Sequence, residues 1–146
     1  MAKDDRLRVP LDPKYAEVLG LATYCFARLE WDAVYCCEGM QKNYLRSVRN
    51  KTAGQIADDF VRLVSALSDQ QLKARCEAPA NEFKRLVGAR NALIHSNPAT
   101  EPGGNQRLVR DGSFWTPELI DEAADEFTAC SLLLNELHHG PLKSYP

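Results

Sequence analysis

The longest regular feature of the sequence is an apolar pattern of helical period that runs unbroken from Asp12 to about Gly39. Apolar side chains recur there at steps of three and four residues: Tyr15, Val18, Leu19, Ala22, Cys25, Phe26, Leu29, Ala33, Cys36 and Cys37. This spacing places them on one face of a helix. Asp12 suits the N-cap and Pro13 the first helical position. The pattern therefore predicts one long amphipathic helix over residues 12–39.

Three more helical regions are expected after a connector. Thr52 predicts the start of a helix whose apolar face carries Ile56, Phe60, Leu63, Val64 and Leu67. A third region begins after Ser68, which suits an N-cap, and runs to His95. Pro79 is expected to divide it into a short helix to about Glu77 and a new helix from near Pro79, because proline lacks the N–H donor of a helix interior. The last helix is expected to start at Thr116-Pro117-Glu118 and to end at Gly140.

The segment between the last two helices is expected to contain the only β-structure. Residues 97–105 read as a loop by their Pro, Gly and Asn content, and residues 106–116 as two short strands around Asp111-Gly112, a strong hairpin signal. The predicted fold class is all-α: an up-and-down bundle of four to five helices with a small β-hairpin before the last helix. The expected organisation is an N-terminal arm over 1–11, one helical domain over 12–140 and a C-terminal tail over 141–146.

Composition limits the classes of protein to consider. The 146 residues are 45% hydrophobic and 26% charged, as in one globular domain and not in a disordered chain. A net charge of −2 argues against coating nucleic acid through bulk charge, although it permits a local basic groove. With neither a signal-like apolar stretch nor a run long enough to span a bilayer, we expect a cytoplasmic protein without membrane contact.

The five cysteines do not predict a metal site. They are odd in number and lack the Cys-x-x-Cys spacing of zinc sites: Cys25, Cys36, Cys37, Cys76 and Cys130. All five fall in helical segments. We therefore expect small buried apolar residues in a reducing compartment, and we expect no metal and no cofactor.

The stretch "FKRLVGARNALIHSNP" places polar groups inside an otherwise apolar helix. Arg90 occupies a position that the core pattern would give to leucine, and Asn91 and His95 share the neighbouring row with Gly88. Burying such groups unpaired is costly, so they are either a satisfied polar patch or a site. Gly88 similarly indicates either a simple helix–helix contact or room for a backbone or a phosphate to approach.

These residue types suit chemistry at a phosphate. A guanidinium binds phosphate oxygens bidentately and stabilises charge that grows in a transition state. A histidine exchanges protons near neutral pH. The segment lacks the clustered carboxylates that would hold Mg²⁺, so metal-assisted hydrolysis is not favoured. Cleavage of RNA without metal needs no protein nucleophile, because the ribose 2′-hydroxyl can attack the adjacent phosphate.

The run "RNALIH", Arg90 to His95, resembles the R-x4-6-H motif of the HEPN superfamily (higher eukaryotes and prokaryotes nucleotide-binding domains). Members commonly have a polar residue after the arginine, as Asn91 is here, and many have glycine where this chain has Ser96. The resemblance covers most of the chain, since the long first helix, the motif near the end of a later helix, a polar loop and a closing helix all fit it.

The resemblance implies a homodimer whose motif-bearing helices meet across a cleft. It also implies a metal-independent RNA endonuclease, often a toxin or defence component held by an antitoxin or other regulator protein. Arg90 would bind the scissile phosphate, Asn91 would support it, and His95 would transfer a proton or orient the 2′-hydroxyl. Many relatives have lost catalysis, so the alternative is a helical dimer that binds a nucleotide or a partner protein.

Other residues are candidates for supporting roles. Lys84 and Arg85, before Arg90, are expected to bind substrate phosphate. Glu30 is either an additional acid of the site or a solvated charge. The basic connector is either an RNA path or a solvated loop, and its cations are Lys42, Arg46, Arg49 and Lys51. The two tryptophans, Trp31 and Trp115, are either core residues or base-stacking residues. The pair His138 and His139 is expected to complement the negative end of the last helix.

Overall fold

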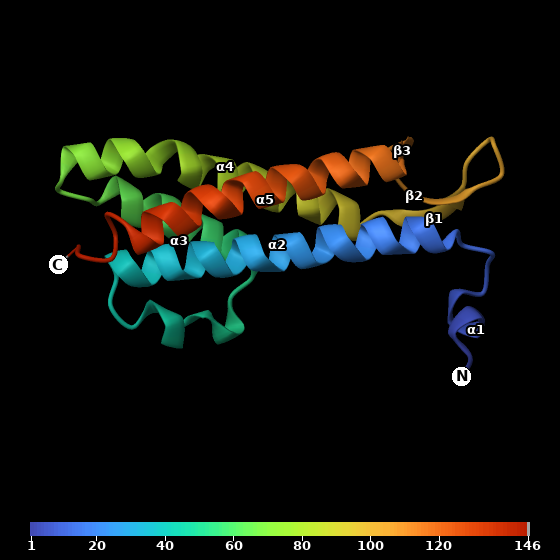
Figure 1. The fold of residues 1–146 in the computed structure, drawn as a ribbon, viewed down its shortest axis with the longest axis horizontal. Coiled ribbons are helices and arrows are strands. Elements are labelled where there is room, and N and C mark those ends of the chain that lie inside the picture. The colour runs from blue at the N-terminus through green and yellow to red at the C-terminus, as the bar shows by residue number, and fades with distance from the viewer. Residues whose placement is uncertain (146) are drawn as a thin grey trace.

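The computed structural model describes residues 1–145, apart from the side chains of residues 3 and 4. The elements follow the order α1 (Lys3–Leu7), α2 (Pro13–Met40), η1 (Tyr44–Arg46), η2 (Val48–Asn50), α3 (Ala53–Ser65), α4 (Gln70–Ile94), β1 (Asn97–Thr100), β2 (Gln106–Arg110), β3 (Ser113–Trp115) and α5 (Pro117–His139). The mostly helical fold with a small antiparallel sheet before the last helix is confirmed (Figure 1). The expected arm contains the short helix α1, and the last residue of the expected tail lies outside the described residues.

The helices do not alternate in direction throughout, so the expected up-and-down order is wrong at one step. Contacts between α2 and α5 keep a nearly constant sequence offset, from Phe26–Phe127 to the Cys36 thiol that donates to the Leu134 carbonyl, so these two helices are parallel. α4 is antiparallel to α3, and Phe60 lies beside Phe83 where the two helices pack. α4 is also antiparallel to α2. Hence α2 and α3 are parallel, and the connector 41–52 returns along α2 (Figure 1).

The predicted helix starts are confirmed where a side chain caps the helix. The Asp12 carboxylate accepts from the Lys14 N–H at 2.9 Å, and Thr52 forms a capping box with Gln55. Thr116 accepts from the Leu119 N–H at 3.2 Å. The expected cap at Ser68 is wrong by one residue: Asp69 caps α4, and its carboxylate accepts from two backbone N–H groups of the first turn.

The predicted break at Pro79 is also wrong, because α4 continues through it as a helix of 25 residues. A proline inside a helix loses one hydrogen bond and crowds the preceding turn. The apolar face on both sides of Pro79 stays in helical register and is buried: Leu72, Cys76, Ala80 and Phe83. Burial of this continuous face offsets the free-energy cost of a proline inside the helix. Sequence rules do not include this burial, so they predict a helix end at Pro79.

The sheet has three strands in the order β1-β2-β3, all antiparallel. The hairpin at Asp111-Gly112 is confirmed, and both residues have positive φ, 50° and 78°, as a tight two-residue turn requires. β1 corrects the expectation of a loop over 97–105. Pro98 is tolerated there because β1 is an edge strand.

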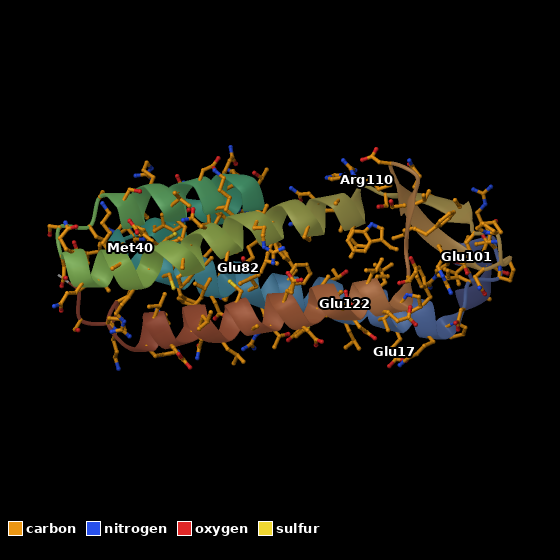
Figure 2. The ribbon with its side chains drawn as sticks, turned by 90° about the horizontal axis from the view of Figure 1, so that it is seen from above. Glu17, Met40, Glu82, Glu101, Arg110 and Glu122 are labelled. Carbon is orange, nitrogen blue, oxygen red and sulfur yellow. The ribbon has the colours of Figure 1, made fainter. Side chains whose placement is uncertain are left out.

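Two apolar clusters form the core. The larger is shared by α2, α3, α4 and α5, and the smaller lies at the hairpin end around Tyr15, Val18 and Ile120. The Tyr15 hydroxyl donates to the Trp115 carbonyl at 2.8 Å and accepts from the Leu108 N–H at 3.0 Å, which joins the sheet to α2. Figure 2 shows Arg110 and Glu101 at the hairpin end and Met40 at the opposite end.

No helix within residues 1–145 combines the length and the apolar character needed to cross a bilayer.

Candidate functional site

Arg90 lies in the last turns of α4 and turns its guanidinium toward α2. The guanidinium carbon lies 4.6 Å from the centre of the Phe26 ring, a cation–π distance. One nitrogen donates to the Asn91 side-chain oxygen at 2.9 Å, and another lies 3.6 Å from a Glu30 carboxylate oxygen. The side chain remains 25% exposed. Arg90 is therefore held in place with part of its donor capacity unused.

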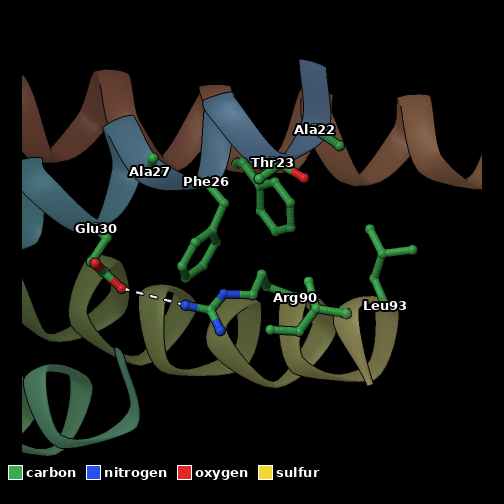
Figure 3. A pocket seen from close by; sticks show the side chains of 9 residues that line it. Ala22, Thr23, Phe26, Ala27, Glu30, Arg90 and Leu93 are labelled. Atoms are coloured by element: carbon green, nitrogen blue, oxygen red, sulfur yellow. Dashed lines mark ion pairs between the residues drawn. The ribbon is translucent and has the colours of Figure 1, made fainter. Parts of the chain in front are cut away.

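An open pocket of about 290 Å³ lies beside this guanidinium, between α2 and the end of α4. Its lining is mainly apolar: Ala22, Thr23, Phe26, Ala27, Glu30, Arg90, Leu93, Ile94 and Phe127. Figure 3 shows the Glu30–Arg90 ion pair at one end of the pocket and Ala22 and Leu93 toward the other. The pocket thus combines an apolar floor with one guanidinium that can accept an anion.

His95 is the C-cap residue of α4, and its ring is exposed. Its ring makes no hydrogen bond to another described residue, and the residue does not line the Arg90 pocket. Five residues of helix separate it from Arg90, which corresponds to about 7.5 Å along the axis and about 140° around it. Within one chain, the structure brings Arg90 and Asn91 together and leaves His95 on a different side of the helix.

The hairpin fixes the end of α4 and with it the backbone of His95. Arg110 donates to the His95 carbonyl at 3.2 Å. The Trp115 indole N–H donates to the Ser96 hydroxyl at 3.1 Å, and that hydroxyl donates to the Ala92 carbonyl at 2.7 Å. These contacts satisfy carbonyls that a helix end otherwise leaves open. The His95 side chain consequently projects from a rigid position.

Lys84 and Arg85 are exposed but carry acidic partners. Lys84 pairs with Asp58 at 2.9 Å. Arg85 pairs with Glu82 at 2.6 Å and also with Glu126, which joins α4 to α5. These partners neutralise part of the charge that was expected to attract substrate. A phosphate contact at either residue would have to compete with a carboxylate.

Gly88 faces open space. A Cβ placed there would meet no heavy atom of the described residues within 4 Å. A helix–helix contact inside this chain therefore does not explain the glycine. The surface above it is free for an approaching group, as the second sequence interpretation requires.

The basic connector is partly structural. Lys51 and Tyr44 both donate to the Asp59 carboxylate, and Glu38 accepts from the backbone N–H groups of Asn43 and Leu45. Its other basic residues are exposed and make no ion pair with a described residue: Lys42, Arg46 and Arg49. The connector is thus a fixed strap with three free cationic side chains.

The cysteines are buried or half-buried and unpaired. Burial raises the pKa of the Cys37 and Cys130 thiols to about 12, so these thiols stay protonated and unreactive at neutral pH. Among the described residues, no group of three or more His, Cys, Asp or Glu side chains is placed to hold a metal ion.

The chain was compared with protein-family models, with curated protein sequences and with solved structures, and none of them matches it.

Arg90 and Asn91 were predicted from the sequence as site residues, but Phe26 was not. Phe26 was assigned to the core, and it is indeed 3% exposed, yet its ring face supports the guanidinium. Glu30 was left open, and the structure places it against Arg90. The available signal was the spacing of four residues between Phe26 and Glu30, which puts both on the same face of α2.

Proposed function

We propose that the protein is a metal-independent RNA endonuclease that acts as a homodimer. The observation that carries the proposal is the Arg90 guanidinium, held by Asn91 beside an open pocket and close in sequence to an exposed histidine. The resemblance of Arg90–His95 to the HEPN motif supports the same chemistry.

In the proposed reaction, Arg90 binds the non-bridging oxygens of the scissile phosphate. The ribose 2′-oxygen forms a bond to phosphorus and gives up its proton, while the bond from phosphorus to the 5′-oxygen breaks and that oxygen gains a proton. The products carry a 2′,3′-cyclic phosphate and a 5′-hydroxyl. Arg90 stabilises the charge that builds on the phosphate, and His95 moves the protons.

A second copy of the chain explains why Arg90 and His95 point to different sides of α4. In a two-fold dimer through this helix, each cleft would receive groups from both chains. Ile94, between the two site residues in sequence, is 47% exposed although it is apolar, and Gly88 leaves the surface open. Both features suit a surface covered by the motif-bearing helix of a partner.

The dimer is tested by sedimentation equilibrium. Ile94→Arg should convert dimer to monomer, because it places a charge in the proposed interface, whereas Leu132→Arg on α5, 61% exposed in the wild type, should leave the dimer intact. A monomeric wild type, or equal behaviour of both variants, contradicts the proposed dimer.

The cleavage is tested with labelled RNA in EDTA. Wild type should cut and His95→Ala should not, whereas His139→Ala, which removes another exposed histidine, should cut normally. RNA with 2′-O-methyl groups should resist cleavage because its nucleophile is blocked. Equal cleavage by wild type and His95→Ala, or none by any of these proteins across diverse RNAs, would sink the assignment.

The alternative is a non-catalytic helical dimer that binds a nucleotide or a partner protein. The observation in its favour is that the cationic side chains already form ion pairs with carboxylates. Glu30 pairs with Arg90, Asp58 pairs with Lys84, and Glu82 and Glu126 pair with Arg85. This alternative predicts binding of nucleotide or protein without any RNA cleavage. It is favoured if RNA stays intact while Arg90→Ala weakens the binding.

A further inference from the structure

A second cleft lies between α2 and α5, on a different side of α2 from the Arg90 pocket. It measures about 460 Å³, a volume typical of small-molecule sites. Its α2 residues Arg28 and Trp31 lie about 140–200° around the helix from Phe26. The two clefts therefore cannot share one ligand, and the chemistry proposed for Arg90 does not account for this one.

One wall of the cleft is aromatic. Trp31 is 48% exposed and meets Tyr35 edge to face, with ring centres 5.6 Å apart. Tyr35 in turn stacks on His138 at 5.0 Å with an angle of 28° between the rings. Tryptophan is normally well buried, so an indole fixed by a neighbouring ring and left half-exposed is a stacking surface for a planar molecule.

The charged and polar groups of the cleft favour an anion. Arg28 is exposed and forms no ion pair with any described residue. Asp32 is already engaged, because its carboxylate accepts from the Ser131 hydroxyl. Burial, and secondly the adjacent His139, lower the pKa of His138, so its ring is neutral at neutral pH. The Arg28 guanidinium is thus free to bind an anion, the Asp32 carboxylate keeps its negative charge but is held by Ser131, and Asn135 adds an amide to the lining.

One polar atom behind the wall of the cleft is poorly satisfied. The Nδ1 atom of His138 is shielded from solvent and has no partner of good hydrogen-bond geometry among the described residues, although the Tyr35 backbone acts on the ring. A buried polar atom without a partner is costly. Because this atom is shielded from solvent, the accessible chemistry of the cleft comes from Trp31 and Arg28.

We propose that this cleft binds a small planar aromatic molecule that carries an anionic group. The ring stacks on Trp31, and the phosphate or carboxylate binds the Arg28 guanidinium, whose fork matches either anion. A nucleoside monophosphate and an aromatic carboxylate share this chemistry. The site is independent of RNA cleavage, so His95→Ala should bind the same molecule as well as wild type does.

The test uses the two tryptophan indole N–H signals in nitrogen-15 NMR spectra of the full chain, since Trp31 and Trp115 are the only tryptophans. Four probes are titrated to millimolar concentration: 5′-AMP, indole-3-carboxylate, adenosine and inorganic phosphate. Trp31→Phe assigns the signals. The Trp31 signal should move with one or both aromatic anions, more strongly than with adenosine or phosphate alone, while the Trp115 signal stays in place.

Arg28→Gln should weaken the binding about tenfold or more, because it removes a charge-assisted contact. Arg49→Gln, which removes another exposed arginine without an ion pair, should not. Stronger binding of 5′-AMP would identify phosphate as the preferred anion, and stronger binding of indole-3-carboxylate would identify carboxylate. Failure of both aromatic anions to move the Trp31 signal, or equal binding by Arg28→Gln, would overturn the proposal.

Discussion

Two half-buried polar clusters border the apolar interior of the bundle, and they are satisfied to different degrees. The Asp59 carboxylate accepts from three donors, the Tyr44 hydroxyl, the Lys51 ammonium and the Arg62 guanidinium, with distances of 2.8 Å to Tyr44 and 3.1 Å to Arg62. Arg90 has one close partner, Asn91, and a more distant one, Glu30.

The difference separates a structural cluster from a candidate site. Three donors from the connector and from α3 leave Asp59 little capacity to bind anything else, so its role is to fix the connector on the bundle. Arg90 retains free donors beside an open pocket. A half-satisfied charge next to a cavity is available to a ligand, whereas a fully satisfied one stabilises the fold.

The largest expected effect is on catalysis. Arg90→Ala should lower RNA cleavage by roughly 100-fold or more, because it removes the group that stabilises charge on the phosphate. The free energy of unfolding should change by about 1 kcal/mol or less, since the side chain is partly exposed and its ion pair is long. Single-turnover cleavage and urea unfolding of the same preparations measure the two quantities.

Arg75→Ala provides the control, since it removes an exposed arginine from the same helix. It should cleave as wild type does. If Arg90→Ala instead lost several kcal/mol of stability with its cleavage rate intact, Arg90 would belong with Asp59 as a structural residue.

Asp59→Ala should show the opposite profile. It leaves the Tyr44 hydroxyl and the Lys51 ammonium without their acceptor in a half-buried place, which should cost about 2 kcal/mol of unfolding free energy. Cleavage per folded molecule should stay unchanged. Asp58→Ala removes the neighbouring carboxylate, which is 67% exposed, and should cost little. Equal stability losses in the two variants would contradict the structural role of Asp59.

The fold was predictable from sequence where short-range chemistry determines it. Asp12, Thr52 and Thr116 identify helix starts because each caps its own first turn, and Asp111-Gly112 identifies a hairpin because both residues tolerate positive φ. The predicted helix break at Pro79 was wrong because burial along the whole of α4 offsets the local free-energy cost of the proline. Only tertiary packing provides that burial. The parallel orientation of α2 and α3 could not be predicted from the sequence either, because it depends on the path of the connector.

The residue types of the site were predictable along α4, but their contacts were not. The row shared by Asn91 and His95 favoured a contact between those two residues, whereas the structure pairs Asn91 with Arg90. The carboxylates that face Lys84 and Arg85 come from α3 and α5 as well as α4, so sequence spacing could not reveal that these cations are already paired. Phe26 looked like any core residue, because its contact with Arg90 exists only once α2 and α4 are packed together.

A smaller effect is expected at Glu30, which competes with a phosphate for Arg90. Glu30→Gln should tighten RNA binding about threefold, in line with the modest energy of a partly exposed ion pair. Binding is measured with wild-type and variant proteins on uncleavable 2′-O-methyl RNA, and Glu17→Gln, elsewhere on α2, should have no effect. Weaker binding by Glu30→Gln would show that Glu30 orients Arg90 instead of competing for it.

The smallest effect concerns His138, which is half-buried like Asp59. Its Nδ1 atom lacks a partner of good geometry among the described residues, as Arg90 lacks partners for some of its donors. Burial and the charge of His139 and Lys143 lower the pKa of His138 in the folded protein, against the opposing effects of Asp32 and of the Tyr35 backbone. The unfolded chain therefore takes up a proton first, near its ordinary pKa of about 6.5. The stability contribution is complete above that value and is lost as the pH falls toward the lower folded pKa.

The free energy of unfolding should accordingly fall between about pH 7 and pH 5.5, by under about 1 kcal/mol from this group. His138→Gln should remove that part of the fall, even though it lowers stability at both pH values by losing the stack on Tyr35. Tyr35→Phe keeps an aromatic ring beside the imidazole and should keep the pH dependence. Urea unfolding at the two pH values measures the difference. An undiminished pH dependence in His138→Gln would mean that other groups cause the fall and that the pKa of His138 is not lowered by folding.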